Sequence, residues 1–299
     1  MTVATETPVA PPAPSEKPEG RPSRIPTFLV IGLMTVIWSI PTLGILINSF
    51  REPGRIRGSG WWTVFGNLFD SSVWTLDNYA TVLDQGFANA FANSLAVTIP
   101  SVVIPITVAA FAAYAFAWMD FPGRNILFVT VVGLMVVPLQ MALVPIFRIY
   151  TGLQLNGSFP AIWLAHAGFG LPLAVYLLRN YMGSLPSSLI ESAKIDGASH
   201  WQIFTRLIIP LSTPVLAAFA IFQFLWVWND YLVALVFLGV AEPRNAVLTV
   251  ELANLAGRGE GALNLLPAAA FVTMVLPLVV FFALQRYFVR GLTAGSVKG

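Results

Sequence analysis

The chain has 299 residues, of which 57% are hydrophobic and 10% are charged, and its mean hydropathy is +0.76. Soluble domains carry roughly 25% charged residues, so this composition excludes an ordinary soluble protein and indicates an integral membrane protein. The formal net charge of +2 gives no electrostatic basis for a nucleic-acid partner. The sequence contains no cysteine, which excludes disulfides, thiolate catalysis and cysteine-ligated metals.

Residues 1–25 are predicted to form a disordered tail. Prolines at positions 8, 11, 12, 14, 18 and 22 are mixed with Ala, Glu, Ser and Lys, and such a composition cannot bury a hydrophobic core. The apolar run that follows is longer than the core of a signal peptide and has no small-residue cleavage site after it. We therefore expect the tail and the first apolar run to remain in the mature protein.

Six apolar runs predict six membrane-spanning helices, because about 20 apolar residues cross the hydrocarbon core of a bilayer. The runs cover residues 26–48, 89–118, 125–150, 158–178, 213–238 and 265–284. We therefore expect an all-α polytopic membrane protein with one transmembrane domain over residues 26–290 and a C-terminal tail over residues 291–299.

The distribution of basic residues predicts the orientation of the chain. Six spans place both termini on one side, and that side holds ten Lys and Arg residues, whereas the opposite side holds six. Because cytoplasmic loops carry an excess of Lys and Arg, we expect cytoplasmic N- and C-termini in the plasma (inner) membrane.

Residues 49–88, between the first two spans, combine charged and aromatic side chains. The aromatic residues are Trp61, Trp62, Phe65, Phe69 and Trp74. Aromatic rings favour the membrane–water interface, so one interpretation is contact with the bilayer surface. A surface that docks a partner protein is the other interpretation.

A charged segment between the fourth and fifth spans, residues 184–211, is named here the elbow. Two pairs within it, Ser188 with Glu191 and Ser199 with Gln202, have the spacing of capping boxes that start helices. Each pair therefore predicts the beginning of a helix, and the orientation given above places both helices on the cytoplasmic side.

The two helices of the elbow are expected to be joined by a tight turn. Asp196-Gly197 lies between them, and this dipeptide is a strong turn signal because glycine adopts a positive φ without strain. Pro210 and Pro214 are expected to break the second helix where the chain re-enters the membrane.

Ionisable side chains inside the spans are costly and are therefore functional candidates. His166 is expected to make one interhelical hydrogen bond. In the fifth span, Phe222, Trp226, Asn229 and Asp230 are predicted to share one helical stripe, at i, i+4, i+7 and i+8. An aromatic surface beside amide and carboxylate groups suits a polyhydroxylated ligand in a substrate pathway. A polar clamp between helices, with aromatic packing, is the alternative.

Motifs for nucleotide hydrolysis and for other catalysis are absent from the sequence. It contains no Gly-x-Gly-x-x-Gly, no phosphate loop of the Gly-x-x-x-x-Gly-Lys-Ser/Thr type, no His-Glu-x-x-His and no Gly-x-Ser-x-Gly. We expect no catalytic residues and no metal site. If transport is driven by ATP, another polypeptide must supply the ATPase. An intramembrane enzyme would need facing ionisable groups in several spans, and a passive channel would give no reason for the elbow.

Two motifs carry a resemblance to a known family. The first is Glu191-Ser192-Ala193, then Asp196-Gly197-Ala198, then Ile208-Ile209-Pro210-Leu211. It closely resembles the cytoplasmic EAA signature of ABC-importer permeases, with Ser192 in place of Ala and Ile209 in place of Leu. The second is the closing sequence over residues 285–299, which is similar to the tail of the MalG-like carbohydrate permeases.

The resemblance implies a type I importer subunit with six helices. Its partners would be a second, MalF-like permease, a dimer of ATPase subunits that bind ATP and Mg, and an extracytoplasmic sugar-binding protein. This chain itself would bind no cofactor. The elbow would be the coupling helix, seated in a cleft of the ATPase.

Further expectations follow from the same resemblance. The residues of the ATPase-coupling site are Glu191, Ser192, Ala193, Asp196, Gly197 and Ala198, and those of a C-terminal ATPase contact are Ser296, Lys298 and Gly299. The sugar would be an α-glucoside such as maltose or trehalose. A permease for another solute class remains an alternative, and so does a passive facilitator.

Overall fold

The computed structural model describes residues 25–239 and 243–293, with residues 286–293 described by their backbone alone. The described part is helical throughout, and its one extended pairing is an isolated antiparallel bridge between Arg51 and Trp74. The all-α fold expected from the sequence is confirmed. Contacts divide the chain after Gly44: the first unit holds the N-terminal part of α1, and the second holds everything from Ile45 onward.

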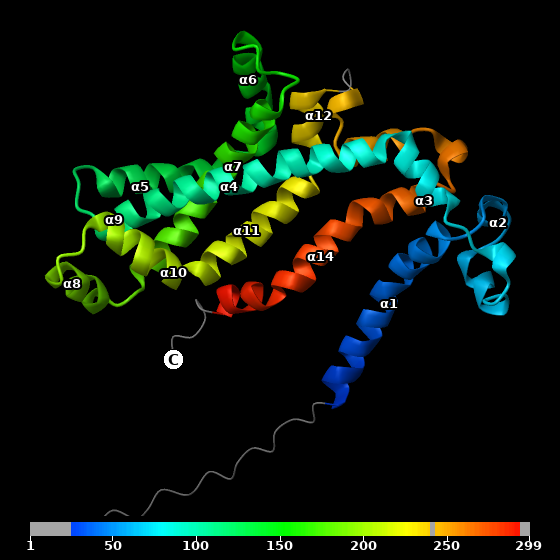
Figure 1. Ribbon diagram of the computed structural model, residues 1–299, viewed down its shortest axis with the longest axis horizontal. Helices are drawn as coiled ribbons and strands as arrows, with labels where there is room; N and C mark the ends of the chain where they lie inside the picture. Colours follow the sequence, from blue (N-terminus) through cyan, green and yellow to red (C-terminus); the bar gives the residue numbers. More distant parts are fainter. Residues whose placement is uncertain (1–24, 240–242, 294–299) are drawn as a thin grey trace, which may run out of the picture. The chain divides into compact units, whose positions relative to one another are not determined.

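The first half of the chain contains three long helices and several short ones (Figure 1). Their bounds are α1 Ile25–Ser49, α2 Pro53–Gly58, η1 Trp61–Gly66, η2 Ser71–Val73, α3 Asp77–Val82, η3 Leu83–Phe87, α4 Ala88–Trp118, α5 Arg124–Gly133, η4 Leu134–Val136, α6 Leu139–Gly152 and α7 Phe159–Gly183.

The second half begins with the elbow and ends with another long helix. The bounds here are α8 Ser187–Ile195, α9 His200–Ile203, η5 Phe204–Ile208, α10 Ile209–Leu211, α11 Thr213–Trp228, α12 Leu232–Leu238, η6 Pro243–Asn245, α13 Leu248–Ala256, η7 Gly259–Ala262 and α14 Leu266–Thr293.

Four helical stretches among the described residues are long and apolar enough to cross a membrane: Ile25–Ser49, Asp77–Trp118, Phe159–Gly183 and Leu266–Gln285. Two bent pairs bring the number to six when each counts as one span. The predicted span over residues 125–150 corresponds to the first pair, in which the helices before and after Pro138 meet at 104°. Proline lacks an N–H and pushes the preceding residue toward an extended conformation, as Val137 shows with ψ 116°.

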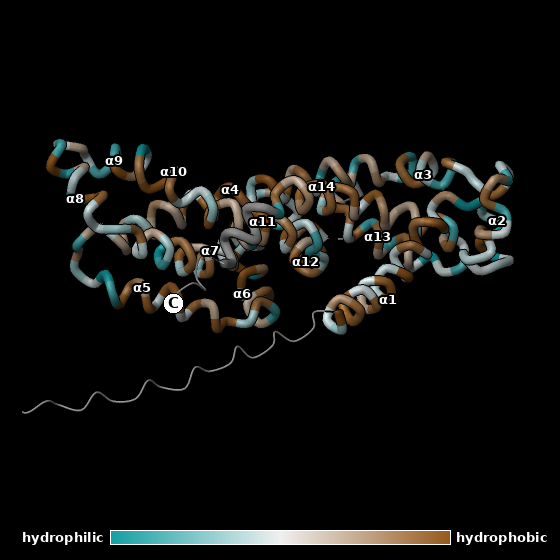
Figure 2. The backbone as a smooth tube through the Cα atoms, turned by 90° about the horizontal axis from the view of Figure 1, so that it is seen from below, coloured by the Kyte–Doolittle hydropathy of each residue, from teal (hydrophilic) through white to brown (hydrophobic). Residues whose placement is uncertain are grey.

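The centre of the second unit is the packing of α4 along α7, with α11 against α4 and α14 (Figure 1). Small residues such as Ala109 and Ala113 on α4 and Ala174 on α7 are fully buried, which lets the helix backbones approach closely. Trp163 on α7 donates from Nε1 to the backbone oxygen of Ala96 on α4 at 2.9 Å. Figure 2 shows apolar residues along these helices and hydrophilic residues gathered in connecting segments, the elbow among them.

Candidate functional site

The elbow forms a helix, a tight turn and a second helix, as the sequence predicts. At the C-terminal end of α8, Gly197 has φ 79°. Its N–H donates to the oxygen of Lys194 at 3.0 Å, and the N–H of Ala198 donates to the oxygen of Ala193 at 2.9 Å. This pair of hydrogen bonds defines a Schellman turn, which satisfies carbonyl groups at a helix end and requires a left-handed residue. The turn expected at Asp196-Gly197 is confirmed.

One of the two predicted capping boxes is present. Ser199 Oγ accepts from the N–H of Gln202 at 3.3 Å, and Gln202 Oε1 accepts from the N–H of Ser199 at 2.8 Å. The box predicted for Ser188 and Glu191 is wrong, because α8 already begins at Ser187 and is preceded by Pro186, which gives no side-chain cap. Glu191 therefore lies in the middle of α8 and does not cap its own helix.

The residues of the EAA-like motif separate onto two sides of the elbow. Ala193 and Ala198 are half-buried and pack against the hydrophobic core formed with α4 and α7. Glu191, Ser192, Asp196 and Gly197 are exposed. The motif thus joins a packing side to an outward side that is free to meet a partner.

Hydrophobic side chains fix the elbow to the long helices. Ile190, Ile203, Phe204 and Ile208 are buried in one cluster with residues of α4 and α7. Phe204 also stacks against Phe111 of α4, with the ring centroids 4.8 Å apart. Since the elbow shares its core with two spans, a force on the elbow reaches those spans directly.

A polar contact supports the same junction. The hydroxyl of Tyr114 on α4 lies 2.8 Å from Nδ1 of His200, the first residue of α9. Above this contact, the rings of Trp201 and Phe111 are stacked with their centroids 6.2 Å apart. The sequence analysis does not single out these four residues, because each belongs to a different local pattern and only the fold brings them together.

An open groove of about 480 Å³ lies between the two helices of the elbow and is lined in part by exposed residues of the motif. Its lining includes five residues of the motif, from Ser192 to Ala198, together with Gln202 and Arg206 from the second helix. Beside it, Ile195 is 85% exposed at the end of α8.

The fifth span is interrupted where the sequence predicts a continuous stripe. Helix α11 ends at Trp228, and α12 begins at Leu232. Asn229 and Asp230 therefore lie in the break, and the prediction of one stripe through all four residues is wrong. Tertiary contacts hold the break: Thr249 Oγ1 donates to the backbone oxygen of Asp230 at 2.6 Å, and Asp230 Oδ2 accepts from the N–H of Ala234 at 3.0 Å.

The carboxylate in this break faces a histidine of the fourth span. His166 is fully buried, and its Nε2 lies 3.7 Å from Oδ2 of Asp230. Neither ring nitrogen of His166 has a hydrogen-bond partner, so the interhelical hydrogen bond expected for this side chain is not formed. The ring instead meets the edge of Trp226 at a centroid distance of 5.3 Å. Asp230 and His166 therefore face each other between two spans without a hydrogen bond, and an aromatic ring packs against the imidazole.

A buried amide joins three spans next to the clamp. Gln223 of α11 donates from Nε2 to the backbone oxygen of Ser101 on α4 at 3.2 Å and to that of His166 on α7 at 3.3 Å. Gly170 on α7 leaves room for the amide, because a Cβ built there would lie 2.6 Å from both amide heteroatoms. The sequence analysis missed Gln223, which carries no charge and belongs to no motif.

The four candidates for the substrate pathway do not share one environment. Trp226 lines an apolar cavity of about 490 Å³ between the bent third span and α7, together with Tyr150, Leu164 and Phe169. Phe222 is half exposed. The exposed Asn229 donates to the oxygen of Leu225 at 2.7 Å. The structure therefore brings Trp226 and Asp230 together around His166 and leaves the other two candidates apart.

The candidates for a C-terminal contact, Ser296, Lys298 and Gly299, lie outside the described residues. Among the residues that the structure does describe, no group of three or more His, Cys, Asp or Glu side chains could hold a metal ion.

Comparisons with known proteins agree with the architecture. The family described as "Binding-protein-dependent transport system inner membrane component" matches residues 105–294. The osmoprotective compounds uptake permease GgtD of Synechocystis is 54% identical over 92% of this chain and 92% of its own length. The α-glucoside transport system permease AglG of Rhizobium meliloti is 57% identical over 82% of this chain and 66% of its own length.

A solved structure shows the same fold. The crystal structure of a bacterial alginate ABC transporter in complex with an alginate pentasaccharide-bound periplasmic protein contains a chain that aligns with a TM-score of 0.60 at 17% identity, over 88% of this chain and 94% of that one. This similarity assigns the type I importer fold. With the family match and the two close relatives, it follows that the chain is no enzyme but an ABC-importer permease subunit of the binding-protein-dependent transport family, in its MalG-like carbohydrate branch.

Proposed function

We propose that this chain forms half of the translocation pathway of an ATP-driven sugar importer and that its elbow couples the spans to a separate ATPase. The observation that carries the proposal is the two-sided elbow, which exposes Glu191, Ser192 and Asp196 while it shares a buried core with α4 and α7. A segment anchored in this way moves with the helices as one body. It can therefore convert closure of an ATPase dimer into rocking of the spans.

The partners follow from what this chain lacks. It has no phosphate loop, so ATP and Mg bind to the partner ATPase dimer. A second, MalF-like permease supplies the other half of the pathway, and an extracytoplasmic binding protein delivers the sugar. The periplasmic protein in the solved alginate transporter supports this assembly. Ser296, Lys298 and Gly299 add a second contact with the ATPase.

The termini and the elbow are cytoplasmic in this proposal, in the inner membrane. Support comes from the ten Lys and Arg residues on their side against six on the other. Single cysteines introduced into this cysteine-free chain, at Ser187 on the elbow and at Thr63 in η1, test the orientation. A membrane-impermeant thiol reagent applied from outside should label only the second position. Labelling of the first position alone would reverse the topology.

The proposed substrate is an α-glucoside such as maltose or trehalose. The support is the relative that transports α-glucosides and is 57% identical to this chain. Within the pathway, Trp226 offers an aromatic face to the 490 Å³ cavity, and Phe222 and Asn229 offer exposed apolar and amide groups. The carboxylate of Asp230 accepts a hydrogen bond from the N–H of Ala234, so its role in this proposal is to position α12.

One experiment tests the coupling role. The complex is reconstituted in proteoliposomes with Glu191→Lys, and with Ser187→Lys as a matched control on the same exposed helix outside the motif. We expect the first variant to lose ATP-driven sugar uptake and binding of the ATPase, whereas the control keeps both. Uptake at the normal rate with Glu191→Lys would contradict the coupling role.

A second measurement tests the solute. Maltose, trehalose, a β-glucoside and an amino acid are offered as radiolabelled solutes to the same vesicles with the binding protein present. Uptake of an α-glucoside alone supports the proposal. Uptake of the amino acid would identify a different solute class, and sugar flux without ATP would identify a passive facilitator.

A further inference from the structure

Residues 50–76, between the first two spans, form a small folded unit that is named here the interspan module. Its two ends are held together by backbone hydrogen bonds, from the N–H of Glu52 to the oxygen of Val73 at 3.0 Å and from the N–H of Thr75 to the oxygen of Phe50 at 2.7 Å. The side chain of Asn78, in α3, closes the base further by donating to the oxygen of Arg51 at 2.8 Å.

Four of the five charged side chains of the module, all except Arg57, have partners inside it. The guanidinium of Arg51 is buried and donates to Asn48 Oδ1 at 2.9 Å and to Ser59 Oγ at 2.6 Å. Burial, together with the nearby charge of Arg55, lowers the pKa of Arg51. These contacts fix the fold of the module from within.

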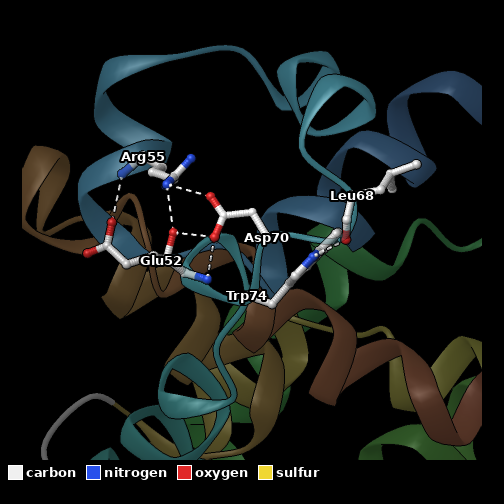
Figure 3. Close-up of polar contacts among 6 residues, drawn as sticks. Glu52, Arg55, Leu68, Asp70 and Trp74 are labelled. Carbon is white, nitrogen blue, oxygen red and sulfur yellow. Dashed lines mark hydrogen bonds and ion pairs between the residues drawn. The ribbon is translucent and has the colours of Figure 1, made fainter.

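Figure 3 shows a second set of polar contacts within the module. Arg55 donates to Asp70 Oδ2 at 3.3 Å, while Asp70 Oδ1 caps η2 by accepting from the N–H of Ser72 at 2.9 Å. Glu52 caps α2 by accepting from the N–H of Arg55 at 3.0 Å. Trp74 donates from its ring N–H to the oxygen of Leu68 at 3.0 Å. The polar side chains thus have internal partners.

The apolar side chains of the same module are left exposed. Phe69 is 102% exposed and Trp62 64%, and Phe65, Leu68 and Leu76 are also exposed. Trp62 and Phe65 are three residues apart in the 3₁₀-helix η1, and this spacing places them on the same face. The ring of Trp61 contacts both, with each centroid distance at 6.1 Å. Trp62 and Phe65 therefore form a group with Trp61 on a folded support, and Phe69 lies four residues further along the chain than Phe65.

The module is continuous in sequence with the two spans that flank it, and this position indicates what covers its exposed rings. The module follows directly on α1, which ends at Ser49, and it leads directly into the span that begins at Asp77. Because its ends are joined at the base, the module is tied at one point to both of these apolar stretches. Arg51, Glu52, Arg55 and Asp70 have hydrogen-bond partners inside the module, whereas the exposed apolar side chains have none. Exposed tryptophan and phenylalanine at such a place match the aromatic belt of membrane proteins.

We propose that the interspan module rests on the bilayer and inserts Trp62, Phe65 and Phe69 into the boundary between headgroups and acyl chains. This chooses between the two interpretations that the sequence leaves open, and it does not depend on the transported solute. In the proposed topology the contact lies on the extracytoplasmic side, where it anchors the connection between the first two spans.

The absence of cysteine makes a direct test possible. The full-length chain in its complex carries a single cysteine, Phe69→Cys or Trp62→Cys, labelled with an environment-sensitive fluorophore. Arg57→Cys, at an exposed charged position of α2, is the matched control. Each variant is reconstituted in liposomes that contain lipids with a nitroxide at the headgroup, at carbon 5 or at carbon 12 of the acyl chain, and aqueous iodide serves as the second quencher.

We expect the two aromatic positions to be quenched at least about twofold more strongly by the headgroup and carbon-5 nitroxides than by the carbon-12 nitroxide, and to be protected from iodide. The control at position 57 should be quenched strongly by iodide and only weakly by the lipid nitroxides. Strong iodide quenching at positions 62 and 69 without quenching by lipids would overturn the proposal. Protection that appears only after the binding protein is added would also overturn it, in favour of a protein-docking surface.

Discussion

Replacing Gly170 with alanine should disrupt the buried junction of three spans. A Cβ at this position would lie 2.6 Å from Nε2 and Oε1 of Gln223 and 2.9 Å from its Cδ, which is closer than real Cβ atoms approach other heavy atoms. The amide is buried and supplies the hydrogen bonds to the backbone oxygens of Ser101 and His166. The new methyl group must therefore displace the amide or push α7 and α11 apart.

The expected cost follows from these contacts. Interhelical hydrogen bonds in membranes contribute about 0.6 kcal/mol on average and at most about 2 kcal/mol, and a buried polar group without a partner costs about 1–3 kcal/mol. Alanine regains about 1 kcal/mol of helix propensity. The net loss for Gly170→Ala is therefore about 1–4 kcal/mol. Gly168→Ala, on the same helix, meets no atom within 4 Å and should be neutral or slightly stabilising.

The assay is the free energy of unfolding of the full-length chain in bicelles, measured for both variants and for Gly170→Ala combined with Gln223→Ala. Because the shortened side chain at position 223 removes the clash, the added alanine should cost little in that background. Equal stabilities of the Gly170→Ala and Gly168→Ala variants would refute the steric argument. If Gly170→Ala lowered the free energy of unfolding by the same amount in the Gln223→Ala background, the role of Gln223 would be refuted.

Three further predictions concern single side chains. Tyr114→Phe removes the hydroxyl that contacts His200 at 2.8 Å, so the elbow should lose a hydrogen bond of about 0.5–1.5 kcal/mol and ATP-driven uptake should fall; unchanged uptake would dismiss this contact. Asp230→Ala removes the carboxylate that caps α12 and should lower the free energy of unfolding by about 1 kcal/mol. Asp230→Asn keeps a capping oxygen and should lower it by less. Equal losses of stability in the two variants would exclude capping as the cause. Hydrogen bonds from Ser72 are the main reason that the pKa of Asp70 is lowered. The stabilisation from these bonds is therefore present above the unfolded pKa of roughly 3.9 and is lost as pH falls through the lower folded pKa. Amide protection factors in the interspan module should drop in that pH range, and Asp70→Asn should remove this pH dependence.

Features that depend on local chemistry could be predicted from the sequence. The turn at Gly197 has its signal in one dipeptide, and the capping box of Ser199 and Gln202 lies within four residues. The same spacing at Ser188 and Glu191 failed, because the helix starts two residues earlier, with Pro186 at the N-cap position. A spacing rule identifies possible caps, whereas the neighbouring backbone decides which one forms.

Features that depend on distant contacts could not be predicted. The break between α11 and α12 contains neither glycine nor proline, and it is held by Thr249, which lies 19 residues further along the chain than Asp230. The interspan module is another case, because its fold depends on the burial of Arg51, and an arginine in a polar segment gives no sign of being buried. In the fifth span, only the fold shows that Asp230 turns toward His166.

The arrangement of the elbow separates two tasks that often conflict in one short segment. Ala193 and Ala198 hold the fold, whereas Glu191, Ser192 and Ile195 face outward without supporting it. Substitutions on the outward side can therefore accumulate at little cost to folding. If the elbow meets the ATPase as proposed, its outward side can adapt to a changed ATPase while the membrane domain stays as it is.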